Sequence, residues 1–430
     1  MKYKVFKFGG ASVKDAEHIK NVLSIIRSYD SEKILVVISA LGKTTNALES
    51  KLPSIAQNPE ESHIILKELI EDHLDIGRAL NLDAESLANT FRKLTDEMIT
   101  SIVKNGNKGS DFIYDQVISL GELFSTKLIE NYMSSCGVLS VWQDVRELFQ
   151  TDNVYKRAKM NMPESGLSVL NVIPDLFSEK DIIITQGFIA RSAEGFTTTL
   201  GREGSDYTAA LFAYFLDAGE LTIWKDVPGI LTADPKRFEN VEKLDRMSYR
   251  EAIEMTYYGA KVIHPKTIQP IQNKGIRLMV NSYLNPGEVG TIISGQGLPN
   301  YPPIVVIEDK VCLLQISSND FSFIQEDHLS HIFNKLNESK IKLLTMRNSA
   351  ISFTLCVKDP GHKRLNALID NLGDYFTIDV FDGLQLITVR HFQENLIKNL
   401  TKNKVVLFEE ILKNTIQLVV KPSLELKEKS

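Results

Sequence analysis

The chain has little cysteine and no long hydrophobic run. Its 430 residues include three cysteines, Cys136, Cys312 and Cys356, and they show neither a disulfide framework nor the spacing of a metal site. No segment approaches the roughly 18 apolar residues of a membrane span. The N-terminal MKYKVFKFGG lacks the continuous apolar stretch of a signal peptide. We therefore expect a cytoplasmic protein that has no membrane partner.

An excess of positive charge is also absent. The net charge is -6, whereas a general nucleic-acid binder usually carries a basic stripe, so we expect no nucleic-acid partner. Local groups of Lys and Arg can still bind small anions. Neither the GxxxxGK[ST] P-loop nor the GxGxxG dinucleotide fingerprint occurs. We therefore expect neither a P-loop enzyme nor dehydrogenase activity from these residues.

The hydrophobic pattern predicts an α/β domain in the first two thirds of the chain. Single cores stop growing near roughly 250–300 residues, so this length predicts two or three domains. Continuous apolar runs, typical of strands buried on both faces of a parallel sheet, occur at 33–40, 181–190, 221–227 and 276–283. Helical patterns separate them, for example at 62–81, 84–104 and 111–135. The expected fold is an α/β/α sandwich with a mostly parallel sheet and ligands at the carboxyl ends of its strands.

The last third of the chain differs in composition and pattern. Residues 285–303 are rich in Gly and Pro and read as a linker. A weak repeat follows, in which VCLLQIS to AISFTLCVK and LQLITVR to TIQLVVK share a strand–helix–strand–strand order. This repeat predicts two ferredoxin-like modules, at about 304–367 and 368–430, after a first domain at 1–295.

Two strand ends carry loops that suit anions. KFGGAS, at 7–12, opens onto a helix, so glycine N–H groups and the helix N-terminus can receive an anion beside Lys7. The loop at 39–48 supplies hydroxyls, including those of Ser39 and Thr45, that suit phosphate or carboxylate oxygens. The alternatives are a tight turn with a surface lysine and an ordinary loop before a helix.

Charged residues beside apolar helical patterns are further candidates. Glu122 lies in SLGELFST and needs a cationic partner, either a substrate ammonium or a neighbouring lysine. The loop TLGREGSD, at 199–206, precedes an apolar helix. Ser205 or Asp206 can cap that helix, but capping does not explain Arg202, whose planar guanidinium matches a carboxylate.

Two later segments complete the set of motifs. The loop TIWKDVPGILTADPK, at 222–236, turns twice and has the polar ends and apolar face that suit a purine and ribose. We expect Trp224 in the core rather than as a stacking platform. The segment at 255–265 places Lys261 near a helix end, and we expect His264 to make a structural hydrogen bond.

In their order along the chain, these motifs resemble those of aspartate kinase, within the amino-acid kinase family. The resemblance covers residues 1 to about 295 and rests on KFGGAS, VVISALGKTTNAL, SLGE, ITQGFIA, TTLGREGSDYTAALFA, WKDVPGILTADP and GAKVIHP. The C-terminal repeat resembles the paired ACT modules of many members. The resemblance implies transfer of the γ-phosphoryl group of ATP, with Mg²⁺, to the β-carboxylate of L-aspartate. That reaction begins lysine, threonine and methionine synthesis.

The resemblance also implies a role for each matching residue. Lys7 and Lys261 would lie near the transferring phosphoryl group, and Asp206 would orient Lys7. Arg202 would bind the substrate α-carboxylate and Glu122 its α-ammonium. The other expected site residues are Ser39, Thr45 and Ser205 for aspartate, and Gly9, Gly10, Lys225, Asp226, Leu231 and Lys236, with both lysines above, for ATP. No residue is assigned as a metal ligand.

The chain departs from the family pattern at several positions. Glu203 stands where the family usually has glycine, and we expect its side chain to turn away from the phosphates. Leu231 and Lys236 replace the Tyr and Arg of several relatives. In the second region, the loop at 317–327 has no glycine, and Lys342 stands at an acidic position of lysine-inhibited relatives. We therefore expect weak or absent inhibition by lysine; a steep loss of activity at millimolar lysine would contradict this.

Two alternatives to the kinase assignment differ in chemistry. Acetylglutamate kinase has a substrate whose nitrogen carries no positive charge for Glu122. A non-catalytic amino-acid sensor would not need Lys7, Asp206 and Lys261. By resemblance, the ACT modules predict a homodimer.

Overall fold

The computed structural model describes residues 3–29, 32–260, 263–319, 322–358, 361–373 and 375–422. The chain divides into two compact units. The first unit comprises Met1–Ile230, Lys243–Ile253 and Val262–Leu298; the second comprises Leu231–Glu242, Glu254–Lys261 and Pro299–Ser430. The chain therefore passes between the two units five times. Among the described residues, no helix is long and apolar enough to cross a membrane.

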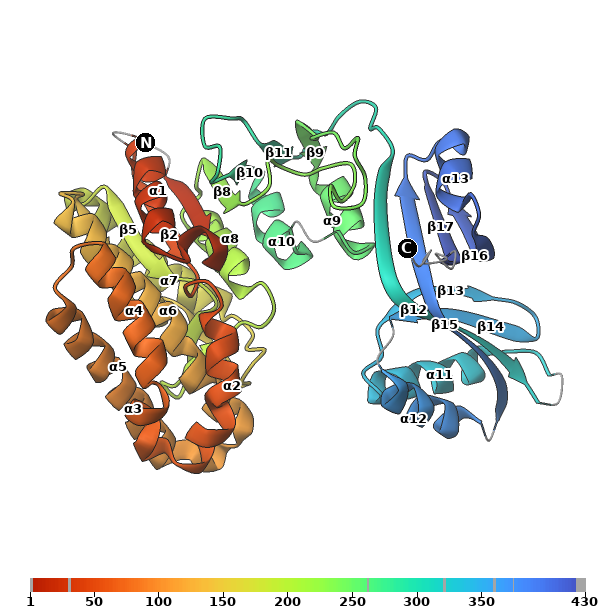
Figure 1. The fold of residues 1–430 in the computed structure, drawn as a ribbon, viewed down its shortest axis with the longest axis horizontal. Coiled ribbons are helices and arrows are strands. Elements are labelled where there is room, and N and C mark those ends of the chain that lie inside the picture. Colours follow the sequence, from red (N-terminus) through yellow and green to blue (C-terminus); the bar gives the residue numbers. More distant parts are fainter. Residues whose placement is uncertain are drawn as a thin grey trace, which may run out of the picture. The chain divides into compact units, whose positions relative to one another are not determined.

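An eight-stranded sheet forms the centre of the first unit (Figure 1). Its spatial order is β3 (Ser140–Trp142), β5 (Ile182–Gln186), β2 (Ile34–Ile38), β1 (Lys4–Phe8), β8 (Glu220–Lys225), β10 (Arg277–Ser282), β11 (Thr291–Ser294) and β9 (Arg246–Ser248). Neighbouring strands are parallel except β10 and β11. Every residue of β2 is buried, so both faces of the sheet are covered. The predicted α/β sandwich with a mostly parallel sheet is confirmed.

Two helices connect this sheet to the site. Helix α6 (Ser110–Ser135) packs along β2, β3 and β5, and α8 (Gly204–Phe215) packs along β1, β2 and β8. The other helices of the unit are α1 (Ala16–Arg27), α2 (Thr44–Gln57), α3 (Ser62–Ile65), α4 (Lys67–Ala79), α5 (Ala84–Asn105), α7 (Met162–Glu179) and α10 (Pro265–Lys274), with the short 3-10 turns Gly10–Val13, Pro59–Glu61, Gly106–Lys108 and Val145–Glu147. A small second sheet contains β4 (Gln150–Thr151), β6 (Ile189–Ser192) and β7 (Thr197–Thr199). Helix α9 (Tyr249–Tyr257) begins in the first unit's segment Lys243–Ile253 and ends in the second unit's segment Glu254–Lys261.

Two sequence predictions for the first unit were wrong. The strand expected at 181–190 is two strands, β5 and β6, because Phe188 adopts a left-handed conformation with φ 70° between them. The Phe188 N–H is donated to Thr208 Oγ1 at 3.1 Å instead of to a neighbouring strand. The linker expected at 285–303 contains β11, which extends the main sheet.

The second unit contains a six-stranded antiparallel sheet. Its order is β13 (Leu343–Asn348), β14 (Ser352–Lys358), β12 (Ile304–Ser318), β15 (Phe376–Arg390), β17 (Thr415–Lys421) and β16 (Val405–Leu412). The accompanying helices are α11 (Glu326–Glu338), α12 (His362–Leu372) and α13 (Glu394–Thr401). The succession β12–α11–β13–β14–α12–β15 is the ferredoxin-like order βαββαβ, so the ferredoxin-like character predicted for this region is confirmed.

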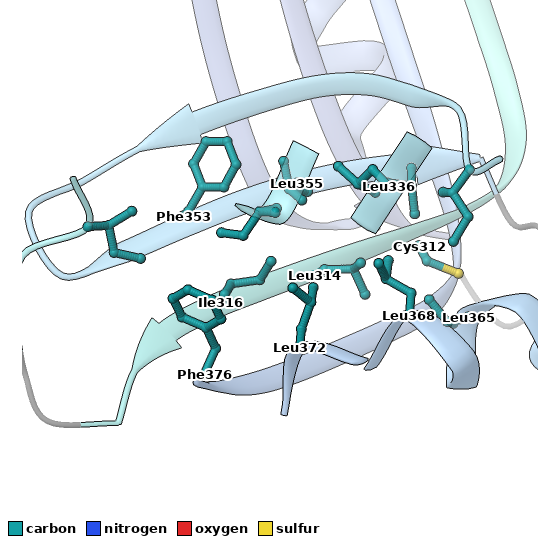
Figure 2. Close-up of a cluster of buried hydrophobic side chains, with 14 residues drawn as sticks. Cys312, Leu314, Ile316, Leu336, Phe353, Leu355, Leu365, Leu368, Leu372 and Phe376 are labelled. Atoms are coloured by element: carbon teal, nitrogen blue, oxygen red, sulfur yellow. The ribbon is translucent and has the colours of Figure 1, made fainter. Parts of the chain in front are cut away.

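Long strands join the two ferredoxin-like modules. Residues 304–309 of β12 pair with 385–390 of β15, while 313–318 of β12 pair with 376–381. Each long strand therefore serves both modules, and the predicted module boundary at 367/368 lies inside α12. Figure 2 shows the core of the first module, where side chains of β12, β14, β15 and both helices interdigitate: Cys312, Leu314, Ile316, Leu336, Phe353, Leu355, Leu365, Leu368, Leu372 and Phe376.

Candidate active site

The register of the main sheet brings several polar side chains to one edge. Lys7 lies opposite Val37 of β2 and Ile223 of β8. Ser39 follows β2, and Lys225 is the last residue of β8. Since these strands are parallel, their carboxyl ends lie together, which is the place where such folds bind ligands.

Close backbone packing holds the loops at this edge. A Cβ on Gly10 would lie 2.7 Å from the Ala40 carbonyl oxygen, and the Gly42 N–H is donated to the Gly10 carbonyl at 3.0 Å. A Cβ on Gly187 would lie 2.4 Å from Ser205 Cβ, so the start of α8 packs directly on the end of β5. Glycine is therefore required at both contacts, because any side chain would separate the loops.

An ion pair links Lys7 to Asp206. Lys7 Nζ lies 2.6 Å from Asp206 Oδ1, and Lys225 Nζ lies 3.9 Å from Asp206 Oδ2. Burial alone would raise the pKa of Asp206, but attraction to Lys7 and Lys225 holds it below its ordinary value. Asp206 is therefore ionised, and the three groups together carry one net positive charge.

The start of α8 differs from the sequence prediction. Neither Ser205 nor Asp206 caps the helix; the N-cap is Glu203, which adopts a left-handed conformation with φ 55° and makes no side-chain cap bond. The helix therefore begins at Gly204, and the two expected caps lie in its first turn. Both side chains line the neighbouring cavity instead.

A cavity of about 730 Å³ opens at this edge of the first unit. It brings together many of the predicted residues: Lys7, Ser39, Thr45, Glu122, Arg202, Ser205, Asp206 and Lys225. It also contains residues to which the sequence assigned no role: Tyr114, Lys156, Arg157, Phe188, Thr199, Gly201 and Gly204. A second cavity of about 600 Å³, lined among others by Trp142 and Arg146, contains none of the predicted residues.

Some predicted residues are not gathered in this cavity. Gly9, Gly10 and Asp226 belong to the same unit but do not line it. Leu231 and Lys236 belong to the second unit, and Lys261 lies outside the described residues. Their roles stay predictions.

Glu122 is a buried carboxyl with no cation beside it among the residues that the structure describes. It is 3% exposed, and its Oε2 has no hydrogen-bond partner among the described residues. Burial raises the pKa of Glu122 to about 8, against the opposing effect of its own N–H and that of Ala40. Gly121 lets α6 approach this closely, since a Cβ there would lie 3.0 Å from Ala40 Cβ. The alternative of a lysine partner is not found in the described part of the chain, so the site can accept an external ammonium.

The loop before α8 presents one cation and one carboxylate. Arg202 is exposed, and no ion pair or hydrogen bond holds its guanidinium among the described residues. Glu203 was expected to turn away, yet it lines the cavity, and its Oε2 is buried without a hydrogen-bond partner in the described structure. Two structural predictions are confirmed: Trp224 lies in the core, at 1% exposed, and His264 makes a structural hydrogen bond by accepting the Lys266 N–H at the start of α10.

Comparison with known proteins decides the family. Residues 2–282 match the amino acid kinase family. The chain belongs to this family. It is 30% identical over 402 residues to lysine-sensitive aspartokinase 3 of Escherichia coli, a match that covers 90% of this chain and 86% of the relative.

Solved structures within the amino acid kinase family agree with this assignment. Escherichia coli aspartokinase III in complex with lysine and aspartate has a TM-score of 0.81 and 27% identity, covering 98% of this chain and 96% of the other. The same enzyme with aspartate and ADP has a TM-score of 0.79 and 27% identity, covering 97% and 96%. Other relatives are longer: the chain spans 42% of a bifunctional aspartokinase/homoserine dehydrogenase of Arabidopsis thaliana, with 29% identity over 87% of its own length.

The amino acid kinase motifs show which site residues the sequence could reveal. Phe188 lies in ITQGFIA, one of the motifs that carry the resemblance, so that motif could have directed attention to it. Arg157 lies in YKRA, which nothing distinguishes from an ordinary surface segment. Among the described residues, no three His, Cys, Asp or Glu side chains gather to hold a metal ion.

Proposed function

We propose that this chain is an aspartate kinase, which transfers the γ-phosphoryl group of ATP to the β-carboxylate of L-aspartate and gives 4-phospho-L-aspartate. This is the first step toward lysine, threonine and methionine. The observation that carries the proposal is one cavity that combines the Lys7–Asp206 pair with Arg202 and the buried Glu122, neither of which has an ionic partner in the described part of the chain. Within the amino acid kinase family, this set fits a substrate with a carboxylate and an ammonium.

The phosphoryl transfer would depend on charge neutralisation and positioning. A carboxylate side chain with pKa near 3.9 is ionised at neutral pH, so no general base is needed to activate it. The obstacle is the repulsion between two anions. Lys7, oriented by Asp206 at 2.6 Å, would offset this charge, and Lys225 lies on the same wall. Lys261 is proposed to assist them.

The substrate would be held by complementary charges. Arg202 would bind the α-carboxylate through its planar guanidinium. Glu122 would receive the α-ammonium, which satisfies the unpartnered Oε2. The hydroxyls of Ser39, Thr45 and Ser205 line the same cavity and would complete the contacts.

The nucleotide would take its contacts from strand ends and loops. Gly9 and Gly10 would offer N–H groups to the phosphates. The other residues proposed for ATP are Lys7, Lys225, Asp226, Leu231, Lys236 and Lys261. Mg²⁺ bound with ATP would neutralise phosphate charge, and it commonly keeps phosphate and water ligands rather than a protein cage.

An acyl-phosphate trap tests the activity. The enzyme is incubated with ATP, Mg²⁺ and hydroxylamine, and with aspartate, glutamate or acetylglutamate as acceptor. With UMP, whose phosphorylation gives no acyl phosphate, ADP release is measured instead. We expect hydroxamate with aspartate only, because acetylglutamate leaves Glu122 without a cation. Failure to form hydroxamate with aspartate would overturn the proposal.

The assignment of Arg202 has its own test. The Arg202→Ala variant should show a large rise in the KM for aspartate while the KM for ATP changes little. Arg92→Ala, at an exposed arginine of α5, is the matched control. A rise in the KM for ATP instead would reassign Arg202 to the nucleotide.

We also infer a homodimer formed through the second unit. Support comes from β16, an edge strand whose Val405, Ile411 and Leu412 are exposed within the chain. Apolar edge strands commonly pair with another chain. Light scattering tests this inference, because a homodimer has twice the mass of one chain. The cytoplasmic location stays a prediction from the low cysteine content.

A further inference from the structure

A second buried carboxylate, Asp115, has no part in the proposed chemistry. It lies on α6, seven residues and about two turns before Glu122, and hence near the same helical face. Its side chain is 0% exposed. It accepts three hydrogen bonds: from the N–H of Thr199 at 2.9 Å, from Thr199 Oγ1 at 2.7 Å and from the N–H of Lys156 at 3.0 Å. A buried carboxylate used in this way joins a helix, a strand and a loop.

These bonds form a closed ring around Arg157. On one side of Arg157, the Lys156 N–H is donated to Asp115; on the other, the Ala158 N–H is donated to the Thr199 carbonyl at 3.0 Å. Thr199 is itself held by Asp115. Lys156 adopts a left-handed conformation with φ 64°, which a lysine keeps only where its surroundings enforce it. The backbone position of Arg157 is therefore fixed from both sides.

The same ring supports Arg202. Thr199 is followed by Leu200 and Gly201, and Gly201 has φ 76°. A Cβ on Gly201 would lie 3.2 Å from the Lys156 carbonyl oxygen and 3.7 Å from Arg157 Cγ. The loop that carries Arg157 therefore rests against the residue that precedes Arg202.

Among the described residues, neither guanidinium is paired with an anion. Arg157 and Arg202 line the same cavity, and neither forms an ion pair or a side-chain hydrogen bond with any described residue. Lys156 differs, since its Nζ lies 2.7 Å from Asp111 Oδ1. Two arginines that line one cavity and have no partner among the described residues make a natural receptor for one carboxylate, because each offers planar donors.

We propose that Arg157 is a second binding residue for the α-carboxylate of aspartate, and that Asp115 is the positioning residue that holds Arg157 beside Arg202. The inference rests on the proposed aspartate kinase function. It gives this cavity two arginines for one carboxylate, with Glu122 at the ammonium. Asp115 touches neither substrate and acts through the two loops.

The first test addresses Arg157, which is exposed and so replaceable without loss of the core. Arg157→Ala should raise the KM for aspartate about tenfold to a hundredfold, the usual effect of losing a hydrogen bond to a charged group. The KM for ATP and kcat should change less than about threefold, since the lost contact binds ground and transition states alike. Lys159→Ala, an exposed cation of the same loop, is the control and should behave as wild type. An unchanged KM for aspartate in Arg157→Ala would overturn the inference.

The second test separates positioning from simple structural support. Asp115→Ala should raise the KM for aspartate, and adding Arg157→Ala should raise it by less than about twofold more, because coupled residues are not additive. If the double variant raised the KM for aspartate by the product of the two single effects, the coupling would be refuted. Asp115→Asn should restore a KM near that of wild type. Its side-chain carbonyl can accept the N–H groups of Lys156 and Thr199, while its amide N–H is donated to Thr199 Oγ1. A KM in Asp115→Asn as high as in Asp115→Ala would also count against positioning.

Two further readouts keep the outcomes distinct. If Asp115→Ala does not fold by circular dichroism, Thr199→Val removes one of the three donors and should raise the KM for aspartate by a few fold; no change would overturn the positioning role. If the wild type forms no aspartyl hydroxamate, the proposed function itself fails. If the wild type is active and Arg157→Ala leaves the KM for aspartate unchanged, the inference is refuted and the proposed function stands.

Discussion

Glu122 predicts that aspartate binding releases a proton. Burial raises the pKa of this carboxyl to about 8, so at pH 7 about nine in ten molecules of free enzyme carry it neutral. An α-ammonium pairs with the ionised form. Binding at pH 7 must therefore first remove the proton, which costs about 1.4 kcal/mol for one pH unit. The apparent affinity for aspartate should fall about tenfold for each pH unit below 8.

Calorimetric titration measures this linkage directly. Aspartate is added at pH 6.0 to 7.5, with a non-hydrolysable ATP analogue present, in buffers of different ionisation enthalpy. The dependence of the observed heat on buffer gives the protons released. We expect about one proton per aspartate at pH 6 to 7, because the raised pKa keeps the free carboxyl protonated throughout that range.

A charge-free variant gives the control. Glu122→Gln cannot ionise, so its affinity for aspartate should be weaker at pH 7.5 and should not vary with pH. Glu130→Gln, on the same helix, should retain the wild-type slope. A pH-independent affinity in the wild type, or an equal slope in Glu122→Gln, would refute the reasoning.

Three further perturbations test the structure around the cavity and its supporting helices. Glu203→Gly should keep or raise turnover and raise the unfolding free energy by about 1 kcal/mol, since φ 55° disfavours a side chain; a collapse of turnover would contradict this. Gly187→Ala should cost about 1–3 kcal/mol in thermal unfolding and raise the KM for aspartate, because its Cβ would overlap Ser205; wild-type values for both would contradict it. Burial lowers the pKa of His73, so the charged form is excluded from the folded state and the unfolding free energy should fall as pH drops below about 6.5. Denaturant titrations at pH 5 and 7.5 should show this loss in the wild type and not in His73→Leu; equal losses would disprove it.

The sequence predicted those parts of the fold that follow from local patterns. Continuous apolar runs revealed β2 and β8, and the polar residues at strand ends identified Lys7, Ser39 and Lys225. Parallel strands bring such ends together without further information.

What the sequence did not reveal depends on contacts between distant segments. The break between β5 and β6 follows from Phe188 bonding to Thr208, twenty residues away. The full length of β12 and β15 depends on pairing across both modules. Arg157 became a candidate only through its neighbours' bonds to Asp115 and Thr199, since its own surroundings in the sequence are ordinary.

The repeated passage of the chain between units has a consequence for dissecting the protein. Segments 231–242 and 254–261 belong to the second unit, where the Val305 N–H is donated to Thr232 at 2.8 Å, Arg237 pairs with Asp309, and Arg390 lies 3.4 Å from Glu254. A truncation near residue 298 would remove the partners of these two segments, while the segments themselves would remain in the fragment. Expression of an isolated catalytic fragment should therefore yield a poorly behaved product, and a circularly permuted or internally deleted gene would be the better starting point.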